Sequence, residues 1–148
     1  MTENILKIPY SAVNNNWDFL HKYLNKIGNP RYIIIGDVDL DDRQDISNLG
    51  NLVGVVGHLG LRRSSIESLG ELQFVDVFLN LYECKNIKTL GNLKKVNGSL
   101  ILFGSTIESL GDLEYIGKDL LLYDVDIPPS ELDKVELLVT YVDNNIYK

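Results

Sequence analysis

A Leu-Gly pair recurs at an almost constant interval along the middle of the chain. The pairs are Leu49-Gly50, Leu69-Gly70, Leu90-Gly91 and Leu110-Gly111, at intervals of 20, 21 and 20 residues. Five further columns, each made only of Val, Ile or Leu, keep the same interval. One unit of this length cannot bury its own apolar side, whereas stacked units bury a continuous core. The repeat therefore predicts a solenoid of similar coils.

The repeating unit reads Val-x-x-x-Leu-x-Leu, then five or six residues, then Ile-x-x-Leu-Gly-x-Leu. The Leu-x-Leu step has the period of a short strand with one face inward, and successive coils would place these strands in one parallel sheet. The Ile-x-x-Leu step is compatible with a helical or 3₁₀ turn, or with a second short extended corner. The columns besides the Leu of Leu-Gly are Ile46, Ile66, Ile87, Ile107 and Ile127; Leu52, Leu72, Leu93 and Leu113; Ile34, Val55, Val75, Val96 and Ile116; Val38, Leu59, Leu79, Leu100 and Leu120; and Leu40, Leu61, Leu81, Leu102 and Leu122.

The two ends of the chain depart from the repeat, as the caps of a solenoid must. Trp17, Leu20, Leu24 and Ile27 fall at helical spacing and predict a helix near 15–27. Asn14–Asn16 supply the N-cap, Gly28 the C-cap and Pro30 the stop. The segment 5–13 before this helix is compatible with an edge strand or an extended arm.

After Ile127 the pair Pro128-Pro129 replaces the expected Leu-Gly. Residues 130–134 indicate a short helical turn, and Leu137–Val142 a last strand. We therefore divide a single structural domain into an N-terminal capping segment with a helix over 1–30, a repeat solenoid over 31–132 and a C-terminal cap over 133–148.

The stretch IESLGDLEYIGKDLLLYDVDI, Ile107–Ile127, resembles the leucine-rich-repeat family, in the short-repeat form of receptor-L-like domains and of bacterial or viral repeats. The resemblance covers residues 31–132. It implies a fold that is α/β by family convention and mostly β: a right-handed solenoid of five to six coils of 20–21 residues, with one parallel sheet and an N-terminal helical cap. The motif is specific for architecture and carries no activity of its own.

Composition and charge exclude several classes of function. The net charge is −7, from 14 basic and 21 acidic residues, whereas binding to phosphates requires clustered Lys and Arg. One cysteine can form no internal disulfide, and with two histidines it makes no zinc site. We expect no cofactor, no metal and no direct nucleic-acid binding. The chain has no apolar run long enough to cross a membrane and no signal-peptide pattern at its start, so we expect a cytoplasmic protein without a membrane partner.

The residues that most often carry catalysis are not arranged for it. His21 and His58 have no nucleophile or carboxylate at a defined spacing, and Gly54–Gly60 lacks the Lys-Ser/Thr of a phosphate loop. The alternating aspartates of 37–42 begin like a calcium loop, but the Gly and the distal Glu of that motif are missing. Cys84 is interpreted as a buried structural thiol. We expect no catalytic residues and no enzyme.

The outward residues of the Leu-x-Leu strands are the candidate site. On three successive coils they are aromatic or aliphatic, which is typical of interface cores. We expect a protein-protein interaction module that binds its partner through this exposed strand face. The candidate residues are Arg62, Phe78, Asn80, Tyr82, Ile101, Phe103, Leu121 and Tyr123. The same rings are also compatible with simple stacking between strands, or with a terminal segment folded over them.

Charge position suggests two other functions. Residues 37–45 carry five Asp against one Arg, and residues 119–143 seven acids against one Lys, so the excess acid lies at the two ends of the repeat. An acidic inhibitor or decoy of the viral or mobile-element anti-defence type would use such a surface to occupy the basic groove of a nucleic-acid enzyme. The acidic candidates are Asp119, Asp124, Asp126, Asp133 and Glu136. A structural component of a larger assembly is the third alternative; the partner and the oligomeric state are left open.

Overall fold

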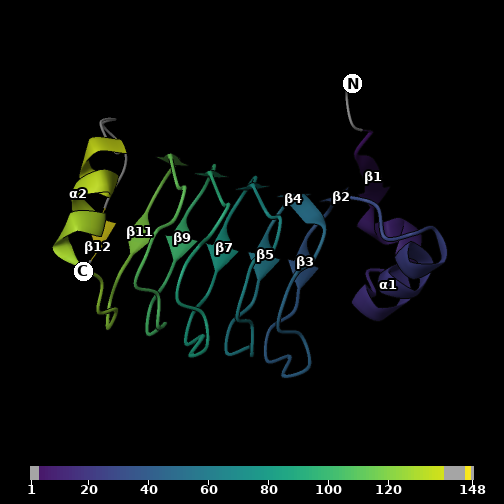
Figure 1. The fold of residues 1–148 in the computed structure, drawn as a ribbon, viewed down its shortest axis with the longest axis horizontal. Helices are drawn as coiled ribbons and strands as arrows, with labels where there is room; N and C mark the ends of the chain where they lie inside the picture. The colour runs from purple at the N-terminus through teal and green to yellow at the C-terminus, as the bar shows by residue number, and fades with distance from the viewer. Residues whose placement is uncertain (1–3, 139–145, 148) are drawn as a thin grey trace.

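The computed structural model describes residues 4–138 and 146–147 (Figure 1). The chain is a mostly-β solenoid of the right-handed type, with about four turns of about 21 residues each. Its coils stack along the long axis of the molecule, with helix α1 at one end and helix α2 at the other (Figure 1). The repeat interval is confirmed, but the turns are fewer than the five to six expected. In the described residues, helix α2 follows the last strand of the repeat.

The N-terminal cap consists of strand β1 (Leu6–Pro9), a 3₁₀ helix (Tyr10–Val13) and helix α1 (Trp17–Lys26). The predicted helix is confirmed, and Asn16 caps it: its Oδ1 accepts a hydrogen bond from the N–H of Phe19 at 3.0 Å. Strand β1 pairs in parallel with β2, so the segment before the helix is an edge strand.

Each coil contributes one strand to each of two parallel sheets, where one sheet was expected. Sheet A has the order β1, β2 (Tyr32–Ile35), β4 (Leu52–Val56), β6 (Phe74–Val75), β8 (Lys95–Val96) and β10 (Tyr115–Ile116). Sheet B has the order β3 (Val38–Asp39), β5 (Leu59–Gly60), β7 (Leu79–Asn80), β9 (Leu100–Ile101), β11 (Leu120–Leu121) and β12 (Ile146–Tyr147). The one-sheet prediction is wrong because the chain is also extended at the Val column, where Val75 pairs with Val55 of the previous coil. The N–H of the next residue, Asp76, donates to the carbonyl of Val55 at 2.9 Å.

The Ile-x-x-Leu step is extended, so each coil has a third extended corner beside its two strands. Of the two alternatives that the spacing left open, the extended corner is therefore correct and the helical or 3₁₀ turn is not. Isolated parallel bridges join Asn48 to Ser68 and Thr89 to Ser109 on adjacent coils. The glycine of Leu-Gly then reverses the chain with a positive φ, 56° at Gly91, and its N–H donates to the Thr89 Oγ1 two residues earlier. An Asn, Ser or Thr stands at this position in every Leu-Gly unit.

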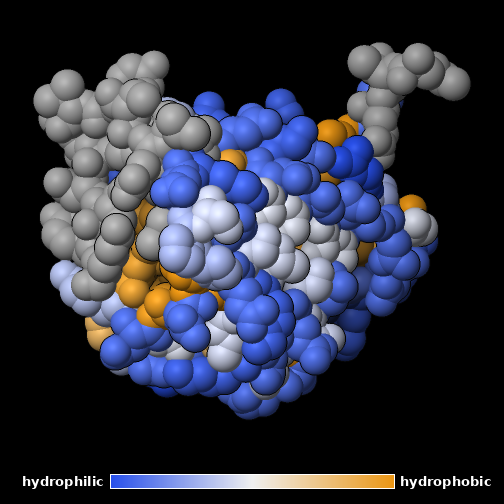
Figure 2. Space-filling view, turned by 60° about the vertical axis from the view of Figure 1, so that its left-hand side comes forward, coloured by the Kyte–Doolittle hydropathy of each residue, from blue (hydrophilic) through white to orange (hydrophobic). Residues whose placement is uncertain are grey.

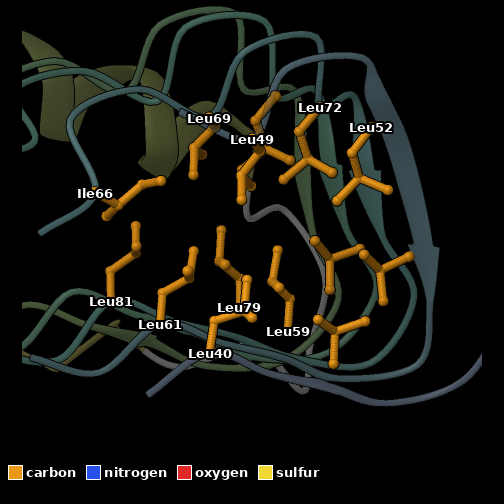
Figure 3. Close-up of a cluster of buried hydrophobic side chains, with 14 of the residues drawn as sticks. Leu40, Leu49, Leu52, Leu59, Leu61, Ile66, Leu69, Leu72, Leu79 and Leu81 are labelled. Atoms are coloured by element: carbon orange, nitrogen blue, oxygen red, sulfur yellow. The ribbon is translucent and has the colours of Figure 1, made fainter. Parts of the chain in front are cut away.

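The core is one continuous cluster that runs through all the coils. The exterior is mostly hydrophilic in the view of Figure 2, with a larger hydrophobic area toward the C-terminal end and smaller ones toward the N-terminal end. Inside, Leu49, Leu52 and Leu69 face Leu59, Leu61 and Leu79 across the coil (Figure 3). Every residue of the predicted columns is buried except Ile127, which is partly buried against the cluster. The inward face of each strand was therefore predicted correctly.

Helix α2 (Pro129–Leu138) follows the last coil. The helical turn expected at 130–134 is confirmed as part of this longer helix, which crosses the expected boundary at 132. The strand expected over Leu137–Val142 is wrong at its first two positions, which end α2; its remaining positions lie outside the described residues.

Candidate protein-binding surface

The outward side of sheet B brings all the predicted binding residues together. We call this surface face B. It comprises Asp37, Asp39, Asp41, His58, Gly60, Arg62, Phe78, Asn80, Tyr82, Ser99, Ile101, Phe103, Asp119, Leu121 and Tyr123. The parallel register aligns Gly60 with Asn80, Asn80 with Ile101 and Ile101 with Leu121, so equivalent residues of successive coils form rows across the strands. The strands β5, β7, β9 and β11 lie side by side in Figure 1.

One row of face B consists of aromatic rings. The centroids of Tyr82 and Phe103 are 5.3 Å apart, and those of Phe103 and Tyr123 are 5.5 Å apart, with tilted planes. These distances are typical of favourable ring pairs, so the expected stacking between coils is present. The rings are not buried by it: Tyr123 is 41% exposed, and Tyr82 and Phe103 are half-buried. We call these three residues the aromatic row.

Half-buried Ile101 and Leu121 lie in the neighbouring row. In the third row Phe78 stacks on His58, with 4.0 Å between ring centroids and 28° between the planes. No described residue hydrogen-bonds the Nδ1 of His58. Aromatic and aliphatic side chains thus occupy the central and C-terminal parts of face B, where a partner could remove them from water.

The N-terminal part of face B is hollowed. Gly60 stands in a row where the other coils carry Asp39, Asn80, Ile101 and Leu121, and its missing side chain leaves a depression of about 270 Å³. Its walls include Asp41 and Arg62, whose Oδ2 and Nε atoms are 3.2 Å apart. Sequence reasoning missed this hollow, although a glycine among larger outward residues was its signal.

The acidic residues of the first coil are engaged within the fold. Asp37 Oδ1 accepts a hydrogen bond from the N–H of His58 at 2.9 Å, which holds the second coil against the first. The Arg63 guanidinium hydrogen-bonds Asp42 and lowers the pKa of its carboxyl group. Arg43 hydrogen-bonds Asp45 and lowers its pKa to about 2. The arginines of two coils therefore compensate much of the acidic charge in 37–45.

The C-terminal acidic candidates whose side chains the structure describes lie on three different parts of the fold. Asp119 is half-buried on face B, whereas Asp124 and Asp126 are exposed in the connection after β11. Asp133 is exposed on α2. Glu136 lies on the same helix, and its side chain lies outside the described structure. Asp124, Asp126 and Asp133 are therefore open to solvent at separate places.

Two residues considered for chemistry have structural surroundings. The Cys84 thiol is buried and donates to the carbonyl of Leu61 at 2.9 Å, and burial raises its pKa, which agrees with a structural thiol. The Nε2 of His21 lies 3.2 Å from the Tyr32 hydroxyl, and burial lowers the pKa of this histidine. Neither residue lies on face B.

Across 4–138 and 146–147, the helices are too short or too polar to span a bilayer. No protein-family model matches the chain, and no curated protein or solved structure is significantly similar to it.

Proposed function

We propose that the chain is a non-enzymatic protein-interaction module, related in its repeat to leucine-rich-repeat proteins, that binds a protein partner through face B. The aromatic row carries this proposal. Three rings on successive coils form a rigid surface that remains partly open to water after they have stacked on one another. Tyrosine and phenylalanine held in this way lose little conformational entropy when a partner covers them.

The surroundings of the aromatic row support the same function. Ile101 and Leu121 extend the apolar area to the next row, and the hollow at Gly60 offers space for a protruding side chain. Polar groups, including Arg62 and Asn80, border the hollow. An apolar centre with a polar margin is the composition of many protein interfaces.

The charge arrangement favours this function over an acidic decoy. The carboxylates of Asp42 and Asp45 are already paired with Arg63 and Arg43, so they offer less negative field to a basic groove. The described C-terminal acids are spread over face B, a connection and a helix. A decoy would depend on those groups, whereas face B presents its apolar residues in one place.

The test is a peptide-display selection against the native chain, followed by affinity measurement with variants. We expect selected ligands to lose at least about tenfold in affinity for the triple variant Tyr82→Ala, Phe103→Ala, Tyr123→Ala, because hot-spot rings carry most of the binding energy. Circular dichroism of this variant should stay nearly unchanged. Tyr115→Ala, an exposed tyrosine on sheet A, is the matched control and should keep the affinity. Ligands that bind the triple variant as well as the native chain would exclude face B as the site.

A further inference from the structure

A second concave surface lies at the N-terminal end of the solenoid and shares no residue with face B. We call it the N-terminal groove. Strand β1 (Leu6–Pro9) forms one wall, and the side of α1 that faces away from the core forms the other. The groove has a volume of about 450 Å³, and most of its lining is apolar. Figure 1 shows β1 and α1 together at this end.

The strand wall has an open hydrogen-bonding edge. Among the described strands, β1 is the first of sheet A and pairs with β2 alone. The N–H of Leu6 donates to the carbonyl of Arg31 at 3.1 Å, toward β2. Because backbone groups alternate in direction along a strand, the N–H and C=O of Lys7 point to the open side. An extended peptide could pair there as an added strand.

The helix wall exposes large apolar side chains. Trp17, Leu20 and Leu24 fill the inward side of α1, which leaves Phe19 and Tyr23 on the groove side. Phe19 is 51% exposed and Tyr23 is 44% exposed. The two residues are one helical turn apart, so they lie next to each other along the groove. They offer an apolar contact to every second side chain of a strand paired with β1.

The groove is basic, although the chain as a whole is acidic. Lys7 on the strand, and Lys22 and Lys26 on the helix, line it. No acidic side chain is among the described residues that form its walls. An occupant with carboxylates would therefore be attracted, whereas one with ammonium groups would be repelled.

We propose that the N-terminal groove binds a short extended peptide segment of a partner protein that carries both acidic and apolar side chains. The peptide backbone pairs with β1 at Lys7, its apolar side chains contact Phe19 and Tyr23, and its carboxylates meet the three lysines. An anionic acyl chain would match the charge and the apolar wall but leave the strand edge unused. A second copy of this chain paired edge to edge through β1 would bring the two sets of lysines together, which disfavours that occupant.

Pro9 has no N–H to donate, and a lysine on an edge strand opposes extended sheet growth. The pairing is accordingly centred on Lys7 and is short. Only a few residues of the bound peptide can therefore pair with β1, and long strands cannot add to this edge.

The test uses a short fluorescent peptide composed of glutamate, leucine and phenylalanine, and measures binding by fluorescence anisotropy. We expect saturable binding that weakens at least about tenfold in Lys22→Glu/Lys26→Glu, because like charges then face the peptide. Lys88→Glu/Lys94→Glu, two exposed lysines of the coils, is the matched control and should keep the affinity. Bound peptide should slow hydrogen exchange of the Lys7 amide.

A peptide N-methylated along its backbone separates strand pairing from simple anion binding, because it keeps the charge and loses the N–H donors. We expect it to bind at least about tenfold more weakly. Equal binding of the methylated peptide would overturn the proposal, and so would equal binding to the charge-reversed variant. Dodecanoate that binds while the peptide does not would assign the groove to an acyl ligand. A dimer in sedimentation that protects the Lys7 amide would assign it to a second copy.

Discussion

The carboxylate of Glu131 accepts a hydrogen bond from the backbone N–H of Leu110, with 2.8 Å between Oε1 and N. The two residues are 21 positions apart, which is one coil of the repeat. In the preceding coil the N–H of Leu90 donates to the carbonyl of Ser109 at 3.2 Å. A side chain of α2 thus replaces the backbone carbonyl that a further coil would have provided. It satisfies a donor at the open end of the stack.

Removal of this carboxylate should destabilise the C-terminal end of the solenoid. We expect Glu131→Ala to lower the free energy of unfolding by about 2 kcal/mol, because the N–H of buried Leu110 loses a charged acceptor. Glu131→Gln keeps an acceptor oxygen and should cost less. Urea unfolding followed by circular dichroism measures the change. Glu108→Ala removes only an exposed ion pair to Lys88 and is the control, with a change near zero. Equal losses in Glu131→Ala and Glu108→Ala would contradict the role of the cap.

The same hydrogen bond should make stability depend on pH. The bond from Leu110, assisted by Lys134, holds the pKa of Glu131 below its ordinary value of 4.5. The unfolded chain therefore binds the proton first as the pH falls, so the contribution of Glu131 is complete above about pH 4.5 and disappears as the pH falls through the folded-state pKa. We expect the stability difference between the native chain and Glu131→Gln to shrink between about pH 5 and pH 3. If this stability difference stayed constant between about pH 5 and pH 3, the ionised carboxylate of Glu131 would not be the form that stabilises the C-terminal end of the solenoid.

The inward residues of the coils could be predicted from the sequence because the stack imposes the same burial on every unit. A position such as Leu100 is equivalent to Leu79 and Leu120, and all three are buried. The second sheet was missed because its strands lack a Leu-x-Leu pair: β8 and β10 each bury a single residue, Val96 and Ile116, so no alternating pattern marks them. Their pairing arises from the stacking of coils and not from local preference.

The candidate surfaces were predictable to different degrees. The aromatic row follows from the repeat, since Tyr82, Phe103 and Tyr123 occupy equivalent positions in register. The N-terminal groove could not be found in this way, because β1 and α1 lie outside the repeat and no column fixes their mutual packing. Counting charges along the sequence could not show how much of the acidic charge is compensated, because Arg63 pairs with Asp42 of the adjacent coil.

The short turn that joins β8 of sheet A to β9 of sheet B should tolerate no side chain at Gly98. A Cβ built there would lie 1.9 Å from the carbonyl oxygen of Val77 on the previous coil, so the coils would have to separate. We expect Gly98→Ala to lower the free energy of unfolding by more than about 4 kcal/mol, or to prevent folding. Gly91→Ala is the matched control: it has open space around the Cβ but a φ of 56°, and should cost only about 1 kcal/mol. Urea unfolding measures both changes. Similar decreases in the free energy of unfolding of the two variants would mean that the close approach of Gly98 to the previous coil does not limit the residue at this position.

Salt should separate the two proposed binding surfaces. Face B would bind mainly through apolar contacts of the aromatic row, so the affinity of its ligands should change little when ionic strength rises to about 1 M, where the Debye length falls to about 3 Å. The N-terminal groove would bind through Lys7, Lys22 and Lys26, so the affinity of the acidic peptide should fall steeply over the same range. Isothermal titration calorimetry at low and high salt measures both. If the affinity of the face B ligands depended strongly on salt, their contacts would lie on the charged groups around Asp41 and Arg62. The acidic-decoy function would then be favoured over binding through the aromatic row.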